Sequence, residues 1–362
     1  MAFTAAVIQD INNMALETYL NKGTIFKQDV ANKPMLAAFQ QRAGSFPGGK
    51  ENVSFLVGSG YGGGGLQGYT DDDQLTHYNP TGSVRFRMPW KEHYIGMVVT
   101  MTELKYDGID VVENGSNQRT SEMSGREAQA LANILDEKNE KLGADYTFSL
   151  DRLVHGDGSN DAKALAGIGA FILENPASGS TGGVNRVANP WWRNHAATAA
   201  ANGAGTGDNK ITSSPTNGGA LITYMDKAAR VRSKYANGQT KVLYFAGSDF
   251  IDAYKGELRA NGMYSQTGWA NGPKPDGSMP DPQHAGIPFI WDPTMDDLGK
   301  SKFCYALDLG PRGLRLMYMD GNKYKKHNPA RPYDRMVMYN GISTTAVMIA
   351  RQLNTSGVYE IN

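Results

Sequence analysis

The sequence is poor in cysteine, in long hydrophobic runs and in signals for export. A single cysteine among 362 residues, Cys304, excludes an intrachain disulfide framework and fits a reducing compartment. We expect it to be a small buried side chain in a strand at 303–307. No apolar run approaches the roughly 20 residues of a membrane span, and no basic segment followed by an apolar core opens the chain. The sequence therefore predicts a soluble protein that is not exported by a classical signal.

Net charge is also missing. The chain has 36 Lys and Arg residues against 36 Asp and Glu residues, so its formal net charge is zero at pH 7. A balanced chain has no strong attraction for nucleic acid or for an anionic membrane. Like-charged copies repel one another, so a neutral chain is free to crowd against further copies of itself.

Motifs for catalysis and metal binding are absent from the sequence. Its histidines, at positions 77, 93, 155, 195, 284 and 327, form no His-Glu-x-x-His motif and no Cys/His cluster. Asp157, Ser159 and Asp161 mimic the start of a calcium loop, but Ala162 and Ile168 replace its glycine and its closing acid, which favours a plain turn. No serine lies in a nucleophile elbow. We predict a protein that is not an enzyme, with no cofactor, no catalytic residue and no metal site.

The longest helical pattern extends from Ser121 to about Gly156. Apolar residues recur there at steps of three, four or seven, and polar residues take the opposite face; the apolar positions are Ala128, Leu131, Leu135, Leu142, Tyr146, Leu150 and Leu153. Ser124 and Glu127 have the spacing of a capping box, although Ser121 offers a start one turn earlier. At ~1.5 Å per residue this helix would be roughly 50 Å long, which indicates an extended subunit.

Strand patterns with a period of two precede the helix, at 53–57, 84–88 and 95–101. A glycine-rich stretch at 58–65 and the run Asp71-Asp72-Asp73 lie between the first two strands. The pattern predicts a long, glycine-tipped β-hairpin followed by a return strand. An isolated two-stranded ribbon is marginally stable in water, so we expect another copy of the chain to support it.

The same glycines also match part of a dinucleotide-binding fingerprint. Gly58, Gly60 and Gly63 follow an apolar strand, as that motif requires. The motif also needs a helix to begin at once, so that its N-terminus faces the pyrophosphate. Residues 66–73 have no helical periodicity. A glycine-loop nucleotide-binding oxidoreductase, or another oligomeric binding module, therefore remains the alternative function.

The most distinctive stretch is the block at 182–193, Gly-Gly-Val-Asn-Arg-Val-Ala-Asn-Pro-Trp-Trp-Arg. Trp191 and Trp192 follow an Asn-Pro turn, which predicts a rigid apolar plug with Arg186 and Arg193 close enough to stack or pair. Further along, a helix at 221–235, strands at 242–246, 287–291, 303–307 and 314–319, and a helix from 248 do not alternate strictly. This order favours an α+β chain over a doubly wound sheet.

The order of these parts resembles the major capsid proteins of tailed bacteriophages with the Hong Kong 97 fold, over essentially the whole chain. The block at 182–193 and the strand segment at 286–292 carry the resemblance most directly. It implies an N-terminal arm at 1–49 and an E-loop at 50–103. It also implies a peripheral domain at 104–218 and 330–362, with a spine helix at 121–156, and an axial domain at 219–329.

The resemblance implies a structural protein that self-assembles into the hexamers and pentamers of an icosahedral phage head around double-stranded DNA. The DNA would be contacted weakly and non-specifically, and no membrane would be involved. The chain would pass from the host cytoplasm into the virion capsid. Because too few residues precede the E-loop for a scaffolding domain, we expect a separate scaffolding protein, together with a portal and, as a further candidate, a decoration protein.

The resemblance also implies which residues serve assembly. At the E-loop tip, contacts between subunits would fall on Tyr61, Tyr69, Asp71, Asp72 and Asp73. The structural plug would be Trp191, Trp192 and Arg193, and the spine helix would use Leu131, Leu135, Leu142 and Gly143. Some relatives crosslink an E-loop lysine to a distant asparagine, but the tip at 58–73 contains no lysine, so that chemistry is not carried over.

Gly143 interrupts the long helix at a cost of up to ~1 kcal/mol relative to alanine. It either softens the helix for a change of curvature when a precursor shell expands or allows close packing against another backbone.

Overall fold

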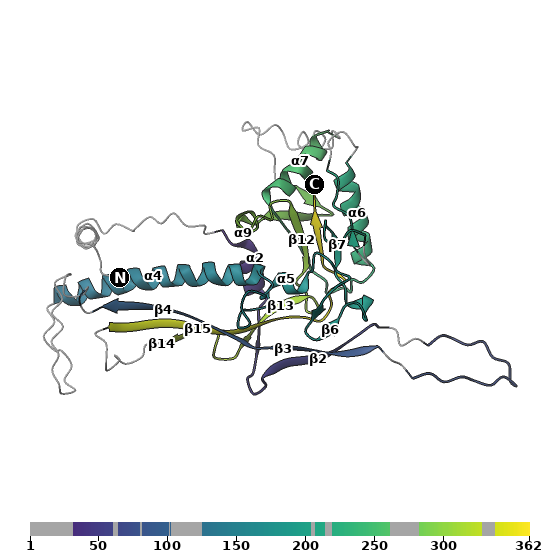
Figure 1. Ribbon diagram of the computed structural model, residues 1–362, viewed down its shortest axis with the longest axis horizontal. Helices are drawn as coiled ribbons and strands as arrows, with labels where there is room; N and C mark the ends of the chain where they lie inside the picture. The colour runs from purple at the N-terminus through teal and green to yellow at the C-terminus, as the bar shows by residue number, and fades with distance from the viewer. Residues whose placement is uncertain are drawn as a thin grey trace. The chain divides into compact units, whose positions relative to one another are not determined.

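The computed structural model describes residues 32–60, 64–79, 82–100, 102, 125–203, 207–213, 219–260, 282–327 and 337–362, and for 125–137, 139 and 338 it describes the backbone alone. Contacts divide the described chain into two compact units (Figure 1). Unit 1 takes in residues 92–150 and 321–344, and unit 2 takes in residues 32–91, 151–320 and 345–362.

Unit 1 is built on the long helix that the apolar periodicity predicts, α4 (Gly125–His155). Three strands accompany it: β4 (Lys91–Thr100), β14 (Lys325–His327) and β15 (Val337–Ala350). β14 and β4 both pair with β15, with Lys325 opposite Ser343 in the antiparallel β14–β15 ladder. None of the described helices is both long enough and apolar enough to cross a bilayer.

A buried tyrosine fastens α4 to the strands of unit 1. The Thr344 hydroxyl donates to the Lys323 carbonyl at 2.7 Å, so the Tyr146 hydroxyl, 2.5 Å from Thr344 Oγ1, is the donor of that pair. The Tyr146 ring also lies edge-on to Tyr324. Burial raises the pKa of Tyr146 to about 12, so it remains a donor at neutral pH. The apolar stripe of the helix is therefore buried at Leu142, Tyr146 and Leu150, as predicted.

Unit 2 contains a seven-stranded mixed sheet with the order β10-β11-β9-β12-β16-β7-β8. Its strands are β10 (Gln283–His284), β11 (Ile287–Trp291), β9 (Val242–Ala246), β12 (Phe303–Asp308), β16 (Gly357–Glu360), β7 (His195–Ala197) and β8 (Gly207–Asp208). β9 pairs in parallel with β11 and antiparallel with β12. The strands predicted at 242–246, 287–291 and 303–307 are confirmed, and so is the α+β class.

Two helices pack on this sheet, α6 (Ala220–Ser233) and α7 (Ser248–Ala260). The core between helices and strands is formed mainly by Leu221, Met225, Tyr244, Phe250, Tyr254 and Phe289. Glu257 of α7 accepts hydrogen bonds from the backbone N–H groups of Leu221 and Ile222, at 3.0 and 3.1 Å. A carboxylate near the first turn satisfies helix-end donors, so α7 caps α6. Cys304 is buried in β12 as expected, and burial raises the pKa of its thiol.

The described part of the predicted arm packs on its own unit. Helix α2 (Pro34–Gln41) buries Met35, Leu36 and Phe39, and β1 (Gly44–Phe46) pairs in parallel with β13 (Leu314–Met319). The sequence reading missed both elements, although proline at the first helical turn is a recognised start signal. The amphipathic piece at 8–19 lies outside the described residues, and the arm at 1–49 stays a prediction.

The seven-stranded sheet takes strands from two of the predicted domains. β7, β8 and β16 come from segments expected to be peripheral, whereas β9 to β12 come from the segment expected to be axial. β13 also pairs with residues 346–350 of β15. The peripheral and axial boundaries at 218/219 and 329/330 stay predictions.

Candidate functional site

The predicted hairpin is present, and its base has two different faces. β2 (Asn52–Gly58) and β3 (Ser83–Pro89) pair antiparallel along their full lengths, with Phe55 opposite Phe86. Val53, Val57 and Phe86 are buried on one face. The side chains of Ser54, Leu56, Arg85 and Arg87 are exposed on the other. We call this paired segment the hairpin root.

The buried face of the root lies against residues 171–194, which we call the seat. The Phe86 ring stacks on Phe55 at a centroid distance of 4.8 Å and lies 5.9 Å from Trp192 and 6.3 Å from Phe171. The backbone N–H of Arg87 donates to the carbonyl of Gly182 at 2.8 Å. Aromatic packing and a backbone hydrogen bond therefore hold the root on its own chain.

Two glycines allow the seat to approach the root. β5 (Ser180–Thr181) and β6 (Val184–Asn185) form a tight hairpin around Gly182 and Gly183, whose φ angles are +60° and +79°. Two-residue turns with positive φ at both central positions favour glycine. A Cβ placed on Gly182 would lie 2.1 Å from the Phe86 ring. Glycine is thus required there for both conformation and space.

Arg186 joins the parts of the seat from inside. Its guanidinium donates to Asn194 Oδ1 at 2.7 Å, to the Phe171 carbonyl at 2.6 Å and to Thr181 Oγ1 at 3.0 Å. These acceptors are all neutral. Burial, with the nearby charge of Arg193, lowers the pKa of Arg186 to about 10, so the group is still protonated at neutral pH. The seat therefore contains a buried cation held by oxygen acceptors.

The predicted plug residues lie together at the end of the seat. Trp192, in the 3₁₀ helix η1 (Pro190–Trp192), is buried, whereas Trp191 lies edge-on to it and is partly exposed. Arg193 Nε donates to the Arg186 carbonyl at 2.8 Å, so the two arginines meet through backbone oxygen. The sequence reading did not identify Phe86 or Gly182 as parts of this site. The Gly-Gly pair between Thr181 and Val184 was the sequence signal that could have indicated the tight turn at Gly182.

The far end of the hairpin, residues 64–79, is exposed throughout; we call it the tip. Asp73 shapes its turn, because its backbone N–H donates to the Thr70 carbonyl and its carboxylate accepts from the Thr70 N–H, both at 2.8 Å. Tyr69, Asp71 and Asp72 are exposed, and Tyr61 lies outside the described residues. The dinucleotide fingerprint would need a helix directly after the glycines, and residues 64–79 form none.

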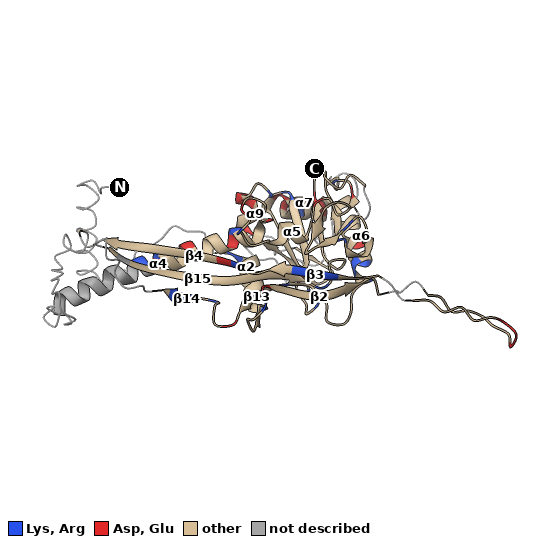
Figure 2. Ribbon diagram, turned by 60° about the horizontal axis from the view of Figure 1, so that its bottom comes forward, with Lys and Arg blue, Asp and Glu red and all other residues tan. Residues whose placement is uncertain are grey.

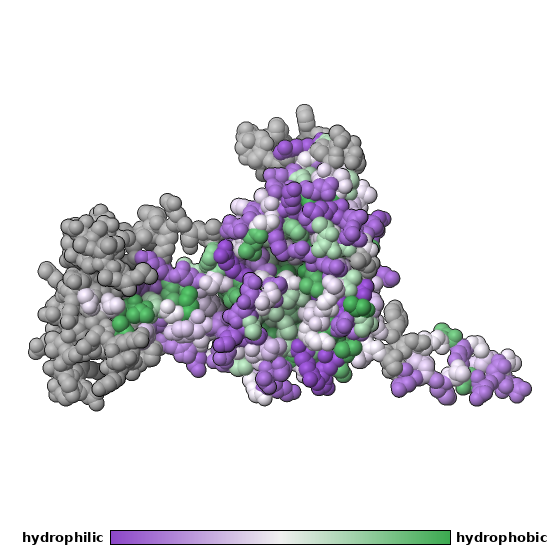
Figure 3. All heavy atoms as spheres, viewed as in Figure 1, coloured by the Kyte–Doolittle hydropathy of each residue, from purple (hydrophilic) through white to green (hydrophobic). Residues whose placement is uncertain are grey.

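Apolar side chains are also uncovered at the tip. Leu66, Tyr69, Leu75 and Tyr78 are all at least half exposed. In Figure 3 the outer part of the hairpin is mainly hydrophilic, with small hydrophobic patches. No described part of the chain covers them.

The structure describes two of the four spine-helix candidates fully. Leu142 is buried, and a Cβ added to Gly143 would meet no described atom within 4 Å. Close packing of another described backbone is therefore not the reason for glycine at this position. The side chains of Leu131 and Leu135 lie outside the description, although both positions fall within α4.

A buried polar cluster lies at the C-terminal end of α4, in unit 2. His155 Nδ1 contacts the Asp151 carbonyl at 2.8 Å, and Nε2 contacts Asp292 Oδ2 at 3.1 Å. Asp292 also caps α9 (Pro293–Asp297), and Thr294 Oγ1 donates to Asp151 Oδ2 at 2.6 Å. Burial alone would lower the pKa of His155, but Asp292 and Asp151 raise it overall. No set of His, Cys, Asp or Glu side chains in the described residues is arranged as a metal site.

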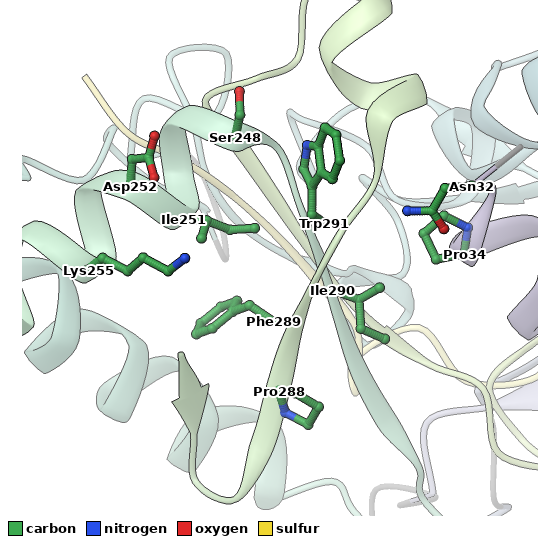
Figure 4. Close-up of a pocket in the computed structure, with 10 residues that line it drawn as sticks. All are labelled: Asn32, Pro34, Ser248, Ile251, Asp252, Lys255, Pro288, Phe289, Ile290 and Trp291. Atoms are coloured by element: carbon green, nitrogen blue, oxygen red, sulfur yellow. The ribbon is translucent and has the colours of Figure 1, made fainter. Parts of the chain in front are cut away.

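A cavity of about 650 Å³ opens in unit 2 between α7 and β11. Ile251 and Lys255 project from α7 toward Phe289, and Trp291 lies farther along the same strand (Figure 4). The indole N–H of Trp291 donates to Asp296 at 2.8 Å. The cavity is thus lined by the aromatic rings of Phe289 and Trp291 and by the charged side chains of Lys255 and Asp252.

A long helix beside paired strands, an exposed hairpin and a mixed sheet covered by helices define the class of the fold. It is the Hong Kong 97-like α+β fold of tailed-bacteriophage capsid proteins, as the sequence resemblance implied.

Solved phage capsids share this fold over nearly the whole chain. The capsid asymmetric unit of cyanophage A-1(L) matches with a TM-score of 0.55 and 16% identity, covering 94% of this chain and 96% of that one. The capsid of Myoviridae phage XM1 matches with a TM-score of 0.54 and 12% identity, covering 94% and 95%. The mature capsid of bacteriophage PhiM1 matches with a TM-score of 0.52 and 8% identity, covering 94% and 90%. No protein-family model and no curated protein sequence matches the chain.

Proposed function

We propose that this chain is the major capsid protein of an icosahedral phage head, and that it assembles into hexamers and pentamers around double-stranded DNA. The likeness of fold to phage capsid structures over 94% of the chain carries this proposal. The composition agrees with it, because a chain of zero formal charge can crowd against itself.

The hairpin supports a role in assembly. Its root is packed on its own chain, while its tip leaves Leu66, Tyr69, Leu75 and Tyr78 in solvent. Covering such residues lowers the free energy by roughly 25 cal/mol per Å² of apolar surface buried. In this proposal Tyr61 and the tip residues Tyr69, Asp71, Asp72 and Asp73 contact another copy. Head-to-tail contacts of this kind close into rings, and obligate interfaces commonly exceed ~2,000 Å².

The other predicted residues take supporting roles. Trp191, Trp192 and Arg193 keep the seat in shape beneath the hairpin root. Leu131, Leu135 and Leu142 stay the predicted positions through which the spine helix serves assembly. Before assembly the chain would lie in the host cytoplasm with a separate scaffolding protein, and afterwards in the virion with a portal and, as a further candidate, a decoration protein.

Gly143 has a proposed role in shell expansion, because a flexible position would let the long helix change curvature. An alanine there meets no described neighbour, so Gly143→Ala should fold normally. We expect Gly143→Ala particles to form but to expand less readily than wild-type particles when they fill with DNA. Electron microscopy before and after filling measures this, and unchanged expansion would remove the proposed role.

The size of the particle tests the main proposal. The full-length chain, expressed alone and together with its candidate scaffolding protein, should form capsomers or megadalton shells by light scattering and electron microscopy. A monomer or dimer that carries nucleotide absorbance would instead support the alternative of a nucleotide-binding oxidoreductase. A monomer or dimer without nucleotide in both preparations would contradict the capsid function.

A further inference from the structure

The exposed face of the hairpin root carries charge of one sign. Side chains alternate between the two faces of a strand, so Arg85 and Arg87 lie on the same face, opposite Leu56 and Ser54 of β2. Leu56 is 66% exposed. Among the residues that the structure describes, none forms an ion pair with either guanidinium. We call Ser54, Leu56, Arg85 and Arg87 the basic face.

The backbone beneath the basic face is held in place. Phe86, between the two arginines, is buried in the seat against Trp192, and the Arg87 N–H is bonded to Gly182. The two guanidinium groups therefore start from fixed points about 6.7 Å apart along the strand. The backbone of the basic face therefore loses little conformational freedom when it binds a partner.

The tip of the same hairpin has the opposite charge. Asp71, Asp72 and Asp73 are exposed, and residues 64–79 contain no lysine or arginine. Figure 2 shows red at the outer end of the hairpin and blue on part of β3. The hydrogen bonds between Asp73 and Thr70 hold the acidic turn in one shape.

We propose that the acidic tip of one copy docks on the basic face of a neighbouring copy. The inference rests on the proposed capsid function and names the surface that receives the hairpin. Asp71 and Asp73 would pair with Arg85 and Arg87, since arginine binds carboxylates with two parallel hydrogen bonds. The exposed Leu56 would meet apolar tip residues such as Leu66 and Tyr69. Each copy then has one tip and one receiving face, and repetition of that contact closes a ring.

The length of the hairpin fits this arrangement. Asp71 lies thirteen positions after Gly58 in the sequence, and an extended segment of that length spans up to roughly 45 Å. That is the width of a compact domain, so the tip reaches an adjacent subunit. Among the described residues, no tip carboxylate forms an ion pair with Arg85 or Arg87 of its own chain. Charge complementarity within the hairpin is therefore satisfied only by a second copy.

A second basic surface fits the tip less well. Lys325 and Lys326 are exposed in β14, but adjacent residues of a strand point to opposite faces. They do not present two charges side by side. Lysine also lacks the planar fork that binds a carboxylate at two points.

A charge exchange tests the proposal in the full-length chain. Arg85→Glu with Arg87→Glu, and separately Asp71→Lys with Asp73→Lys, should each lower the assembled fraction about tenfold, since the loss is repeated at every contact of a ring. The four substitutions together should restore assembly to within about threefold of wild type. As matched control, Lys325→Glu with Lys326→Glu makes the same change in net charge and should not rescue the Asp71→Lys, Asp73→Lys variant.

The outcomes separate this inference from the proposed function. If the wild type forms particles, three results would overturn the docking and leave the capsid function intact. Either double variant could assemble normally, the four substitutions together could fail to restore assembly, or the Lys325 and Lys326 control could rescue equally well. Failure of the wild type to assemble, alone and with scaffold, would overturn both. All substituted positions are exposed, so each variant should unfold at the same urea concentration as the wild type before assembly.

Crosslinking gives an independent measurement. Asp72→Cys with Arg85→Cys, treated with a short bismaleimide in assembled particles, should give a ladder of covalent oligomers. Cys304 is buried, so it adds little background. Either substitution alone should stop at dimers, and Asp72→Cys with Lys325→Cys should give no ladder. A ladder from that control, or none from the Asp72/Arg85 pair, would contradict the proposal.

Discussion

The root and the tip of the hairpin are two ends of one ribbon with opposite surroundings. In the root, β2 and β3 pair along their full lengths and bury Val53, Val57 and Phe86. In the tip, residues 64–79 are exposed and form no paired strand. A two-stranded ribbon is stable when one of its faces is buried against another surface. The comparison shows that the seat completes the root, whereas the tip must obtain its support elsewhere.

Composition follows the same division. The root is rich in valine and phenylalanine and lies on Trp192, Phe171 and a Gly-Gly turn. The tip is made of Gly, Asp, Thr and Gln with scattered large apolar residues. Substitutions in the root and seat should therefore lower the stability of the single chain, and substitutions in the tip should act on assembly alone. Five predictions test this division.

Removal of the buried tryptophan should have the largest effect. Trp192→Ala leaves a cavity beneath Phe86, and large-to-small changes of this kind cost about 3–5 kcal/mol of unfolding free energy. Urea denaturation of the unassembled chain measures the loss. The matched control is Trp191→Ala, which removes a partly exposed ring and should cost clearly less. Equal losses for the two variants would show that the buried Trp192 ring supports the root no more than the partly exposed Trp191 ring does.

Replacement of the buried cation should have the next largest effect. Arg186→Met removes the guanidinium hydrogen bonds to Asn194 Oδ1, Thr181 Oγ1 and the Phe171 carbonyl, at a cost of about 1–3 kcal/mol of unfolding free energy. Part of the cost is offset because no charge is then buried. Arg193→Met is the control at a partly exposed position, and thermal unfolding compares the two. A stabilised Arg186→Met chain would mean that the buried charge outweighs its hydrogen bonds.

Acid should lower the unfolding free energy of the chain through His195, which directly follows the seat residue Asn194. Burial and the Arg232 charge lower the pKa of His195 to about 4. Between that value and the ordinary pKa near 6.5 the unfolded chain binds more protons, so stability falls as pH falls, by up to about 3 kcal/mol. His195→Gln should flatten this part of a pH titration of urea unfolding. An unchanged slope would assign the acid sensitivity to other groups.

Protonation of His155 should have the opposite effect and stabilise the folded chain. Asp292 and Asp151 raise its pKa despite burial, so its contribution is complete below pH 6.5 and is lost as pH rises through the raised value. His155→Asn should therefore lower the unfolding free energy below that window and flatten the pH profile of urea unfolding within it.

A tip substitution should have the smallest effect on the single chain. Tyr69 is 68% exposed, so Tyr69→Ala should change unfolding free energy by less than about 0.5 kcal/mol. It should still reduce the yield of particles, because the ring is available only to another copy. Tyr235, which is also exposed but follows α6 and is no part of the hairpin, provides a matched Tyr235→Ala control. A loss of chain stability in Tyr69→Ala would show that the tip is supported within its own chain.

Local pattern in the sequence was enough for α4, for the β2–β3 hairpin and for the burial of Cys304. These features depend on periodicity, turn residues and residue size, all of which can be read along a short stretch. The Gly-Gly turn and the tryptophans were also visible, but their partner was not. Phe86 lies far from Trp192 in the sequence, and no local spacing encodes that contact.

By itself, then, the sequence determined the elements, the neutral charge and the resemblance to a capsid subunit. Only the tertiary structure decided that Phe86 lies on Trp192, that Arg186 is buried among neutral oxygens, and that His155 lies between Asp151 and Asp292. It also decided that one face of the root is covered and the other is free. These outcomes depend on which distant segments pack together, and packing is set by the whole chain and not by any single segment of it.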